Sequence, residues 1–381
     1  MEKCIVCGSQ KIIPVIKILE MPIFCNVLLS SKTEAINALK GDLDICFCEN
    51  CGHIFNKAFN SRILKYTEDY DNTLRYSRKF QTFAEELAYM LIRKYAINRK
   101  NVIDIGCGKG DFLNLICTLG NNNGVGFDAS YQKERSENNT NVRFVKEFFN
   151  IKYADLPADL VCCRNVLEHI ENPGAFLSEI IDIVREHNPV FYFEVPNALY
   201  TIKDLGIWDL IYEHVSYYSK DSLESLFKSC GLEVLNINEG FGGQYLMIEG
   251  KIGKPRITTD TESINTTKKL VDKFSDEYYK KKNHWEKFVN NNKEKKTVIW
   301  GAGSKGVTFL NVINDKKIEY IVDINPHKQG RFVPGIGTRV VSPGFLKDYK
   351  PDIVILMNAL YEREVRETLN SLSLISKIFY G

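Results

Sequence analysis

The sequence lacks any apolar run of the length that a membrane-spanning helix requires, and its first residues lack the apolar segment of a signal peptide. It also lacks an excess of charge, since 50 Lys and Arg against 48 Asp and Glu leave a formal net charge of +2. That charge is too small for the basic surface on which nucleic-acid binding depends. Internal repeats are absent as well. We therefore expect a cytoplasmic protein with no membrane or nucleic-acid partner.

The size and composition are those of a globular protein with several cores. The chain has 381 residues, of which 44% are hydrophobic, enough for two or three domains. Alternating apolar strands and amphipathic helices from residue 102 onward predict a parallel α/β sheet with helices on both faces. A second α/β unit starts at residue 297. Between the two, apolar residues at helical spacing within 251–296 predict a long connecting helix.

The 11 cysteines include two pairs with the spacing of metal ligands. Each Cys-x-x-Cys pair is followed at once by glycine, which lets the backbone turn tightly around an ion. Four thiolates make the closed tetrahedral site that is typical of structural zinc. His53 is a less favoured substitute ligand, and buried free thiols are the alternative to a metal site. The predicted zinc ligands are Cys4, Cys7, Cys48 and Cys51.

A glycine-rich loop follows the first strand of the predicted parallel sheet. It carries Gly106, Gly108 and Gly110, and Asp104 stands two residues before the first of them. Glycine at alternate positions lets the backbone pass close under a ligand at the end of a strand. A second acid, Asp128, ends the next predicted strand, where a carboxylate can accept both hydroxyls of an adenosine ribose. The pattern predicts a cofactor site, with an ordinary strand-turn-helix as the alternative.

The C-terminal unit has a glycine loop of a different spacing. Gly301-Ala302-Gly303-Ser304-Lys305-Gly306 fits the dinucleotide-binding fingerprint, and Asp323 follows the next predicted strand. The same loop also suits the diphosphate of a nucleotide sugar, because loop amides, a helix N-terminus and the ammonium group of Lys305 favour an anion. Asp323 is expected to cap the turn into Asn325, or alternatively to hold a ribose hydroxyl.

Several segments, spread over nearly the whole chain, together resemble the three-domain sugar C-methyltransferases of deoxysugar pathways. Beyond the cysteine pairs and the two glycine loops, the matching segments are Asn165-Val166-Leu167-Glu168-His169-Ile170, Glu194-Val195-Pro196-Asn197, Glu213-His214-x-Ser216-Tyr217-Tyr218-Ser219 and Asp323-Ile324-Asn325-Pro326-x-Lys328-Gln329-Gly330. The resemblance implies an α/β protein with an N-terminal zinc-binding module, a central class I methyltransferase Rossmann-like domain and a C-terminal Rossmann-like domain. The implied boundaries are 1–65 for the zinc module, 66–250 for the methyltransferase domain, 251–296 for a linker with a connecting helix, and 297–381 for the C-terminal domain.

The resemblance also implies a reaction. S-Adenosylmethionine would be the methyl donor, Zn²⁺ the structural ion, and a nucleotide-linked 4-keto sugar the acceptor. By this likeness His214 is the base that removes the proton next to the ketone, and Glu213 either orients its ring or stays charged nearby. Tyr76 and Tyr217 would help to hold the enolate.

Further site residues follow from the same resemblance. The implied cofactor-binding residues are Asp104, Gly106, Gly108, Gly110, Asp128 and Asn165. The implied substrate-binding residues are Glu194, Asn197, Gly243 and Lys305. Glu194 fits a buried structural carboxylate equally well, and Gly243 a simple hairpin turn. His169 is expected to shape the adenosine site or to pack, rather than to transfer a proton.

One segment departs from the family pattern. The chain reads Ile211-Tyr212-Glu213-His214 where the family often has Tyr-His-Glu-His, so the tyrosine is displaced by one residue. Methylation at oxygen or nitrogen of a related sugar is therefore an alternative. An NAD-dependent oxidoreductase using the C-terminal glycine loop is a second alternative, and a zinc-containing adaptor with degenerate Rossmann units is a third. The sequence predicts neither the sugar nor the oligomeric state.

Overall fold

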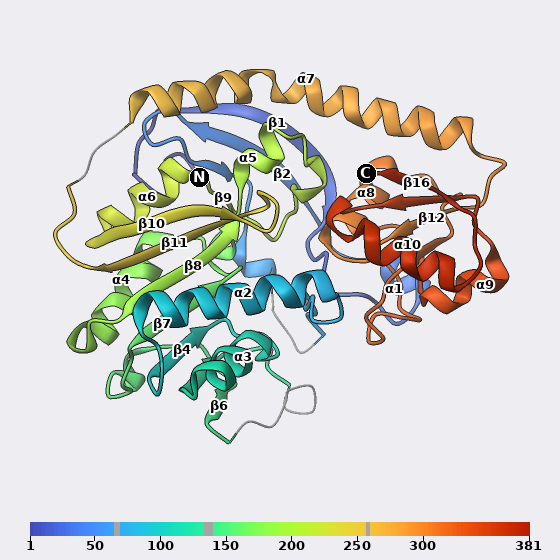
Figure 1. The fold of residues 1–381 in the computed structure, drawn as a ribbon. Coiled ribbons are helices and arrows are strands. Elements are labelled where there is room, and N and C mark those ends of the chain that lie inside the picture. Colours follow the sequence, from blue (N-terminus) through green and yellow to red (C-terminus); the bar gives the residue numbers. More distant parts are fainter. Residues whose placement is uncertain (65–68, 133–139, 257–259) are drawn as a thin grey trace.

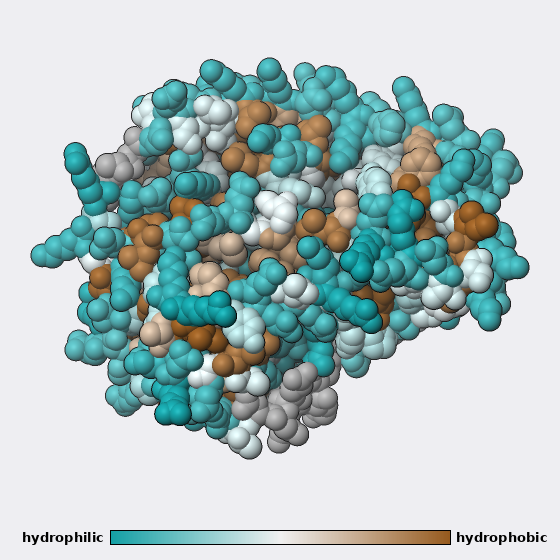
Figure 2. Space-filling model, viewed as in Figure 1, coloured by the Kyte–Doolittle hydropathy of each residue, from teal (hydrophilic) through white to brown (hydrophobic). Residues whose placement is uncertain are grey.

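Three sheets, the shorter helices that flank them and one long helix make up the computed structural model, which describes residues 1–64, 69–132, 140–256 and 260–381. Figure 1 shows helix α7 (Thr261–Asn291) running along one side of the molecule, past the first two sheets to the third. No described helix combines the length and apolarity that crossing a bilayer needs. Figure 2 shows a mostly hydrophilic face on which apolar side chains form small, separate patches.

The N-terminal sheet is antiparallel, with the strand order β1-β2-β3-β9. Its last strand comes from the central part of the chain, so residues 216 and 217 complete the module that the sequence predicts at 1–65. Its elements are β1 (Ile12–Pro22), α1 (Lys32–Ile36), β2 (Lys40–Cys48), β3 (Ile54–Asn56) and β9 (Ser216–Tyr217).

The central sheet has seven strands in the order β10-β11-β8-β7-β4-β5-β6, and β11 runs antiparallel to both of its described neighbours, β10 and β8. The strands are β4 (Asn101–Ile105), β5 (Asn123–Phe127), β6 (Val142–Val145), β7 (Leu160–Arg164), β8 (Val190–Pro196), β10 (Leu232–Gly240) and β11 (Tyr245–Ile252). The helices are α2 (Arg78–Tyr95), α3 (Asp111–Gly120), α4 (Pro173–Val184), α5 (Ala198–Ile202) and α6 (Lys220–Ser229).

The apolar strands of this sheet are buried on both faces. Val102 packs with α2 and α3, while the next residue, Ile103, packs with α4 and α6 on the opposite face. Because successive side chains of a strand point to opposite faces, a strand covered on both sides needs apolar residues at consecutive positions. The continuous apolar runs of β4 and β7 follow from this requirement.

The C-terminal sheet is wholly parallel among its described strands, with the order β14-β13-β12-β15-β16. Its strands are β12 (Thr297–Trp300), β13 (Tyr320–Val322), β14 (Arg339–Val341), β15 (Ile353–Leu356) and β16 (Lys377–Tyr380). Its helices are α8 (Ser304–Ile313), α9 (Leu346–Tyr349) and α10 (Glu362–Ser371).

In both α/β sheets the order in which the chain adds strands reverses near the middle of the sheet. From β4 the chain adds β5 and β6 on one side and then returns to add β7 on the other. From β12 it adds β13 and β14, and then returns with β15. Loops that leave adjacent strands in opposite directions open a crevice at the carboxyl ends of those strands, where such sheets bind ligands.

One hydrophobic core joins the first and last sheets. Phe274 and Trp285 of α7 lie in the same buried cluster as Leu43 of the N-terminal sheet and Ile299 and Phe309 of the C-terminal unit. Burial of aromatic side chains contributes strongly to such contacts. We infer that α7 fixes the C-terminal unit against the rest of the chain rather than acting as a loose linker.

Gly306→Ala should destabilise the C-terminal unit. A methyl group there would lie 2.0 Å from the carbonyl oxygen of Gly301, so the loop and α8 would have to separate. We expect the free energy of unfolding to fall by about 1–3 kcal/mol, as for other overpacked sites. Gly174→Ala is the matched control in α4, because its new methyl would meet no atom within 4 Å. Equal melting temperatures for the two variants would contradict this account.

Candidate functional site

A cavity of about 680 Å³ lies between the central and C-terminal sheets. The loops after β4 and β7 line one part of it, and the loops after β12, β13 and β15 line another. Tyr76 and Ser77, just before α2, also line the cavity. The crevices at the two strand-order reversals therefore open into one shared space, of a size typical of small-molecule sites.

The central glycine loop has the backbone that its spacing predicts. Gly106, Gly108 and Gly110 all have positive φ, at 71°, 58° and 83°. A side chain at Gly110 would strike Phe144, whereas one at Gly108 would meet no protein atom within 4 Å and would point into open space. Gly108 lines the cavity. The loop therefore leaves room for a ligand at Gly108, while Gly110 is needed for packing.

Asp128 supports this loop directly. Its Oδ2 accepts a hydrogen bond of 2.8 Å from the amide of Gly108. Its Oδ1 accepts from the amide and the hydroxyl of Ser130, at 2.7 and 2.6 Å. Asp128 is half-buried and does not itself belong to the described cavity lining. These bonds hold the loop in place, and one lone pair of Oδ2 is left over.

Asp104 is a buried acid on the cavity wall, only 2% exposed. Burial raises its pKa to about 7, although the nearby guanidinium of Arg164 acts in the opposite direction. Arg164 is held by Glu194, with 2.9 Å between Nη2 and Oε1. Glu194 is fully buried and is absent from the described cavity lining, so its contacts are those of a structural carboxylate. A positively charged ligand beside Asp104 would favour its ionised form.

Three further predicted residues shape the loops around this end. Asn165 adopts the left-handed conformation, with φ of 53°, and lines the cavity. Asn197 is the N-cap of α5, and its Nδ2 donates to the carbonyl oxygen of Gly243 at 2.9 Å. Gly243 lies in the hairpin turn between β10 and β11. Asn197 and Gly243 do not belong to the described cavity lining, but the neighbouring Gln244 does.

Glu168, His169 and His214 converge on the cavity wall. One ligand atom of each lies within 4.8 Å of the others. The two imidazole ring centres are 4.9 Å apart. Nδ1 of His169 lies 2.9 Å from the carbonyl oxygen of Glu213, and its Nε2 lies 3.9 Å from Oε1 of Glu168. A main-chain bond of 2.9 Å from Val215 to the carbonyl of Glu168 joins the two segments.

Burial dominates the electrostatics of this cluster. It lowers the pKa of His169 to about 4 and that of His214 well below its usual range. It raises the pKa of Glu168 to about 8. In the absence of a ligand, all three side chains therefore favour their neutral forms.

The neighbours of His214 are arranged differently from the sequence expectation. The Glu213 side chain is fully buried, and its Oε2 accepts from the amide of Cys25 at 3.0 Å. The hydroxyl of Tyr217 bonds to the main-chain N and O of Ile211, at 3.2 and 3.0 Å. Neither belongs to the described cavity lining, whereas Tyr76 and His214 do. Glu213 meets the histidine cluster through its main-chain carbonyl, which bonds to His169.

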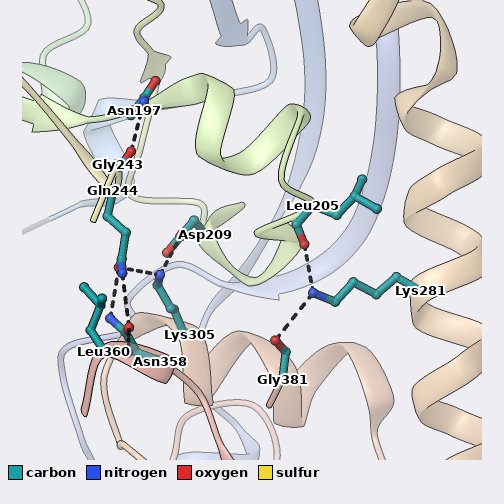
Figure 3. Close-up of polar contacts among 10 residues, drawn as sticks. All are labelled: Asn197, Leu205, Asp209, Gly243, Gln244, Lys281, Lys305, Asn358, Leu360 and Gly381. Atoms are coloured by element: carbon teal, nitrogen blue, oxygen red, sulfur yellow. Dashed lines mark hydrogen bonds and ion pairs between the residues drawn. The ribbon is translucent and has the colours of Figure 1, made fainter. Parts of the chain in front are cut away.

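Lys305 links the C-terminal unit to the central domain at the far end of the cavity. Its Nζ lies 3.1 Å from Oδ2 of Asp209 and 2.8 Å from Oε1 of Gln244, as Figure 3 shows. Gln244 exchanges two hydrogen bonds with Asn358, the second residue after β15. Figure 3 also shows Lys281 of α7 reaching the carbonyls of Leu205 and Gly381. Lys305 lines the cavity and Lys281 does not.

Asp323 stabilises the glycine loop of the C-terminal unit through hydrogen bonds. Oδ2 of Asp323 accepts from the amide of Ala302 at 2.8 Å, and Oδ1 accepts from the amide of Asn325 at 2.8 Å. The cap interpretation thus describes its contacts. On another side of the cavity Glu364 of α10 accepts from Ser77 and from the amide of Lys79, at 3.1 and 2.6 Å. The two domains therefore meet around the cavity through polar contacts.

The four predicted cysteine ligands lie together. Sγ of Cys4 is 3.7 Å from Sγ of Cys51, and Sγ of Cys7 is 3.6 Å from Sγ of Cys48. A tetrahedral ion with bonds of about 2.3 Å requires sulfur atoms about 3.8 Å apart. Gly8 and Gly52, which follow the two cysteine pairs, have the same left-handed backbone conformation, each with φ of 71°. The donor set and its spacing fit zinc.

His53 is not part of this group. It is fully buried, and its ring lies 5.0 Å from that of Tyr218 and 5.8 Å from that of Phe55. The described metal-ligand group contains the four cysteines only. The substitute-ligand alternative therefore has no support from the geometry.

Sequence reasoning missed two parts of the site. It expected His169 to shape the adenosine site or to pack, and it did not place the ring against that of His214. It also gave no role to Asp209, Gln244 or Glu364, which line the cavity and hold the two domains together. A motif carries no signal for such pairings, because their partners are far apart in the chain.

Family models cover most of the chain. A model described as a methyltransferase domain matches residues 74–237, and one described as a C-methyltransferase C-terminal domain matches residues 256–375. Among curated relatives, a mitochondrial ubiquinone biosynthesis O-methyltransferase of Dictyostelium discoideum is 31% identical over 109 residues, covering 24% of this chain and 34% of that protein. The chain thus spans about a third of that relative. The C-methyltransferase NovU of Streptomyces niveus is 22% identical over 397 residues, covering 96% of this chain and 91% of that protein.

Solved structures match about half of this chain at low sequence identity. An S-adenosylmethionine-dependent methyltransferase from Archaeoglobus fulgidus is 20% identical, with a TM-score of 0.35, covering 48% of this chain and 100% of that chain. The 1,6-didemethyltoxoflavin-N1-methyltransferase of Burkholderia thailandensis, with bound S-adenosylhomocysteine, is 14% identical, with a TM-score of 0.35, covering 53% of this chain and 96% of that chain.

Proposed function

Because the chain is an enzyme of the class I methyltransferase kind, we propose that it transfers a methyl group from S-adenosylmethionine to a carbon of a nucleotide-linked keto sugar. The match to a C-methyltransferase C-terminal domain and the similarity to a C-methyltransferase over nearly the whole chain support carbon as the acceptor. The observation that carries the proposal is that His214 lines a cavity bounded by both glycine loops.

The cofactor belongs to the central loop in this proposal. The open space at Gly108 suits the close approach of a ligand to the backbone. Asp104 would face its positively charged groups, and Asp128 would accept from a ribose hydroxyl with the lone pair of Oδ2 that Gly108 leaves over. Gly106, Gly110 and Asn165 would hold the loops in position. Bound S-adenosylmethionine supplies an electrophilic methyl group on a sulfonium.

The chemistry requires one proton to leave the sugar. A neutral imidazole of His214 would take the proton from the carbon next to the ketone, leaving an enolate. The enolate carbon would bond to the methyl group that S-adenosylmethionine supplies, the sulfur–methyl bond would break, and S-adenosylhomocysteine would leave. Tyr76, which lines the cavity, would donate to the enolate oxygen. Tyr217 and Glu213 act through the segment that carries His214, since both are bonded within the protein.

The nucleotide end would lie at the C-terminal loop. Lys305 can exchange Asp209 for a diphosphate oxygen, and the amides at the start of α8 favour the same charge. Asn197 and Gly243 would position Gln244 there rather than touch the sugar, and Glu194 would support Arg164. The four cysteines would hold one structural Zn²⁺, whose closed site leaves no position for water.

Gly108→Val should abolish most cofactor binding without unfolding the protein. The side chain would occupy the open space beside the loop, so we expect affinity for S-adenosylmethionine to fall at least about tenfold, or 1.4 kcal/mol. Gly231→Val is the matched control. Gly231 also has positive φ and no atom within 4 Å of an added Cβ, but it does not line the cavity. If calorimetry finds the same affinity for S-adenosylmethionine in the Gly108→Val and Gly231→Val variants, this cofactor site loses its basis.

His214→Ala should lower product formation by about 10²–10⁴-fold, the usual contribution of a general base, while cofactor affinity stays unchanged. Solvent deuterium exchange at the carbon next to the ketone should fall in parallel. His187→Ala, at an exposed histidine, is the control. Mass spectrometry with labelled methyl donor and a panel of nucleotide-4-keto sugars provides the readout. Turnover without exchange would instead indicate methylation at oxygen or nitrogen.

Lys305→Met should raise the KM for the nucleotide sugar with little effect on cofactor affinity. Removing one charge from a phosphate site typically costs about 1.5–3 kcal/mol, which is about tenfold or more in KM. Lys281→Met tests whether loss of a domain contact is responsible, because Lys281 also bridges domains but lies outside the cavity lining. Equal KM values for both variants would contradict the nucleotide site. Tight binding of NAD would favour the oxidoreductase alternative.

Elemental analysis should find about one zinc per chain in protein prepared without chelator. Cys48→Ser should lose the ion and lower stability before it changes the chemistry, because the site is structural. Cys46→Ser is the control. Cys46 is also buried on β2 but lies outside the cysteine group. Zinc well below one per chain in the unaltered protein would refute the assignment.

A further inference from the structure

The cluster formed by Glu168, His169 and His214 has features of a metal site that a packing role does not explain. Its three donor atoms lie within 4.8 Å of one another, and all three side chains line the cavity. Glu168 is only 1% exposed, and among the described residues no hydrogen-bond donor reaches its Oε2. A buried carboxylate oxygen in that position costs free energy unless a ligand satisfies it.

The orientation of His169 points in the same direction. Its Nδ1 lies 2.9 Å from the carbonyl oxygen of Glu213, and a carbonyl can only accept. The neutral ring therefore carries its proton on Nδ1 and a lone pair on Nε2, which lies on the side of Glu168. Metal-binding histidines characteristically donate their second ring nitrogen to a main-chain carbonyl or a carboxylate in this way.

His214 completes the donor set. Among the described residues no partner reaches its buried Nδ1, and its ring lies nearly perpendicular to that of His169 at an angle of 75°. Two imidazoles and one carboxylate, with the cavity open on one side, form the donor set. Such a set binds first-row transition-metal ions in preference to Mg²⁺ or Ca²⁺. This set is distinct from the four thiolates near the N-terminus, which favour zinc.

We propose that Glu168, His169 and His214 bind one divalent first-row transition-metal ion, and that the ion and the substrate's proton compete for His214. The ion would be held by one Glu168 oxygen, Nε2 of His169 and one ring nitrogen of His214, with its remaining positions facing the cavity. A histidine nitrogen bonded to a metal has no lone pair left to accept a proton. The second part of the proposal rests on His214 being the base, whereas the first part does not.

Mn²⁺ binding to the full-length, zinc-loaded protein tests the site directly. Mn²⁺ prefers nitrogen and oxygen to thiolate ligands, so the cysteine site does not interfere. We expect the signal of free Mn²⁺ in electron paramagnetic resonance to fall until one ion is bound per chain, and pulsed spectra to show coupling to imidazole nitrogen. Absence of saturable binding, or bound Mn²⁺ without nitrogen coupling, would overturn the proposal.

Variants locate the ion. Glu168→Gln and His214→Ala should each raise the Kd for Mn²⁺ by about 100-fold or more, since even the loss of a supporting hydrogen bond costs 10–100-fold. Glu186→Gln and His187→Ala, exposed residues of the same types, should leave it unchanged. Each variant must retain zinc and affinity for S-adenosylmethionine, which shows that it is folded. Equal Kd values for all four variants would place the ion elsewhere.

Turnover separates this proposal from the proposed reaction. Product formation should fall as Mn²⁺ occupancy rises and recover when a chelator removes the ion. If turnover rises with occupancy, the metal site stands but His214 is not the base and competition is refuted. If Mn²⁺ does not bind while His214→Ala still abolishes exchange at the sugar carbon, the metal site fails and the proposed reaction stands.

Discussion

The molecule depends on one geometric constraint: the carboxyl ends of two α/β sheets must face the same space. Each sheet opens a crevice where its strand order reverses, at β4 with β7 and at β12 with β15. Neither crevice alone encloses the cavity. The apolar core shared by α7, the N-terminal sheet and the C-terminal unit holds the two sheets in position. Polar contacts of Lys305 and Glu364 join the two domains around the cavity.

The division of forces between these contacts has a functional consequence. The core around Trp285 and Phe309 is apolar, and neither residue belongs to the described cavity lining, so these contacts can fix the domains without competing with a ligand. The contacts at the cavity are an ion pair and hydrogen bonds, whose partners a polar ligand can replace. Lys305 is therefore both a domain contact and a residue available to an anionic substrate.

Burial sets the chemistry of the cavity wall. Asp104, Glu168, Glu213 and the two histidines all have pKa values shifted toward their neutral forms. Neutral imidazoles can accept a proton or a metal, and a buried acid beside a cofactor responds to its positive charge. Burial of these side chains therefore suits the cavity wall both to accept a proton or a metal ion and to bind a positively charged cofactor.

The sequence determined what depends on neighbours along the chain. Glycines at 106, 108 and 110 specified a loop with positive φ, the Cys-x-x-Cys-Gly pairs specified two identical turns, and the methyltransferase assignment agrees with the family matches. The family resemblance also grouped Tyr217 and Glu213 with His214, but their side chains bond within the protein. Only the tertiary structure decided that, and it alone brought His169 to His214, β9 to the N-terminal sheet and Lys305 to Asp209. These pairings depend on how sheets and α7 pack, which no local pattern encodes.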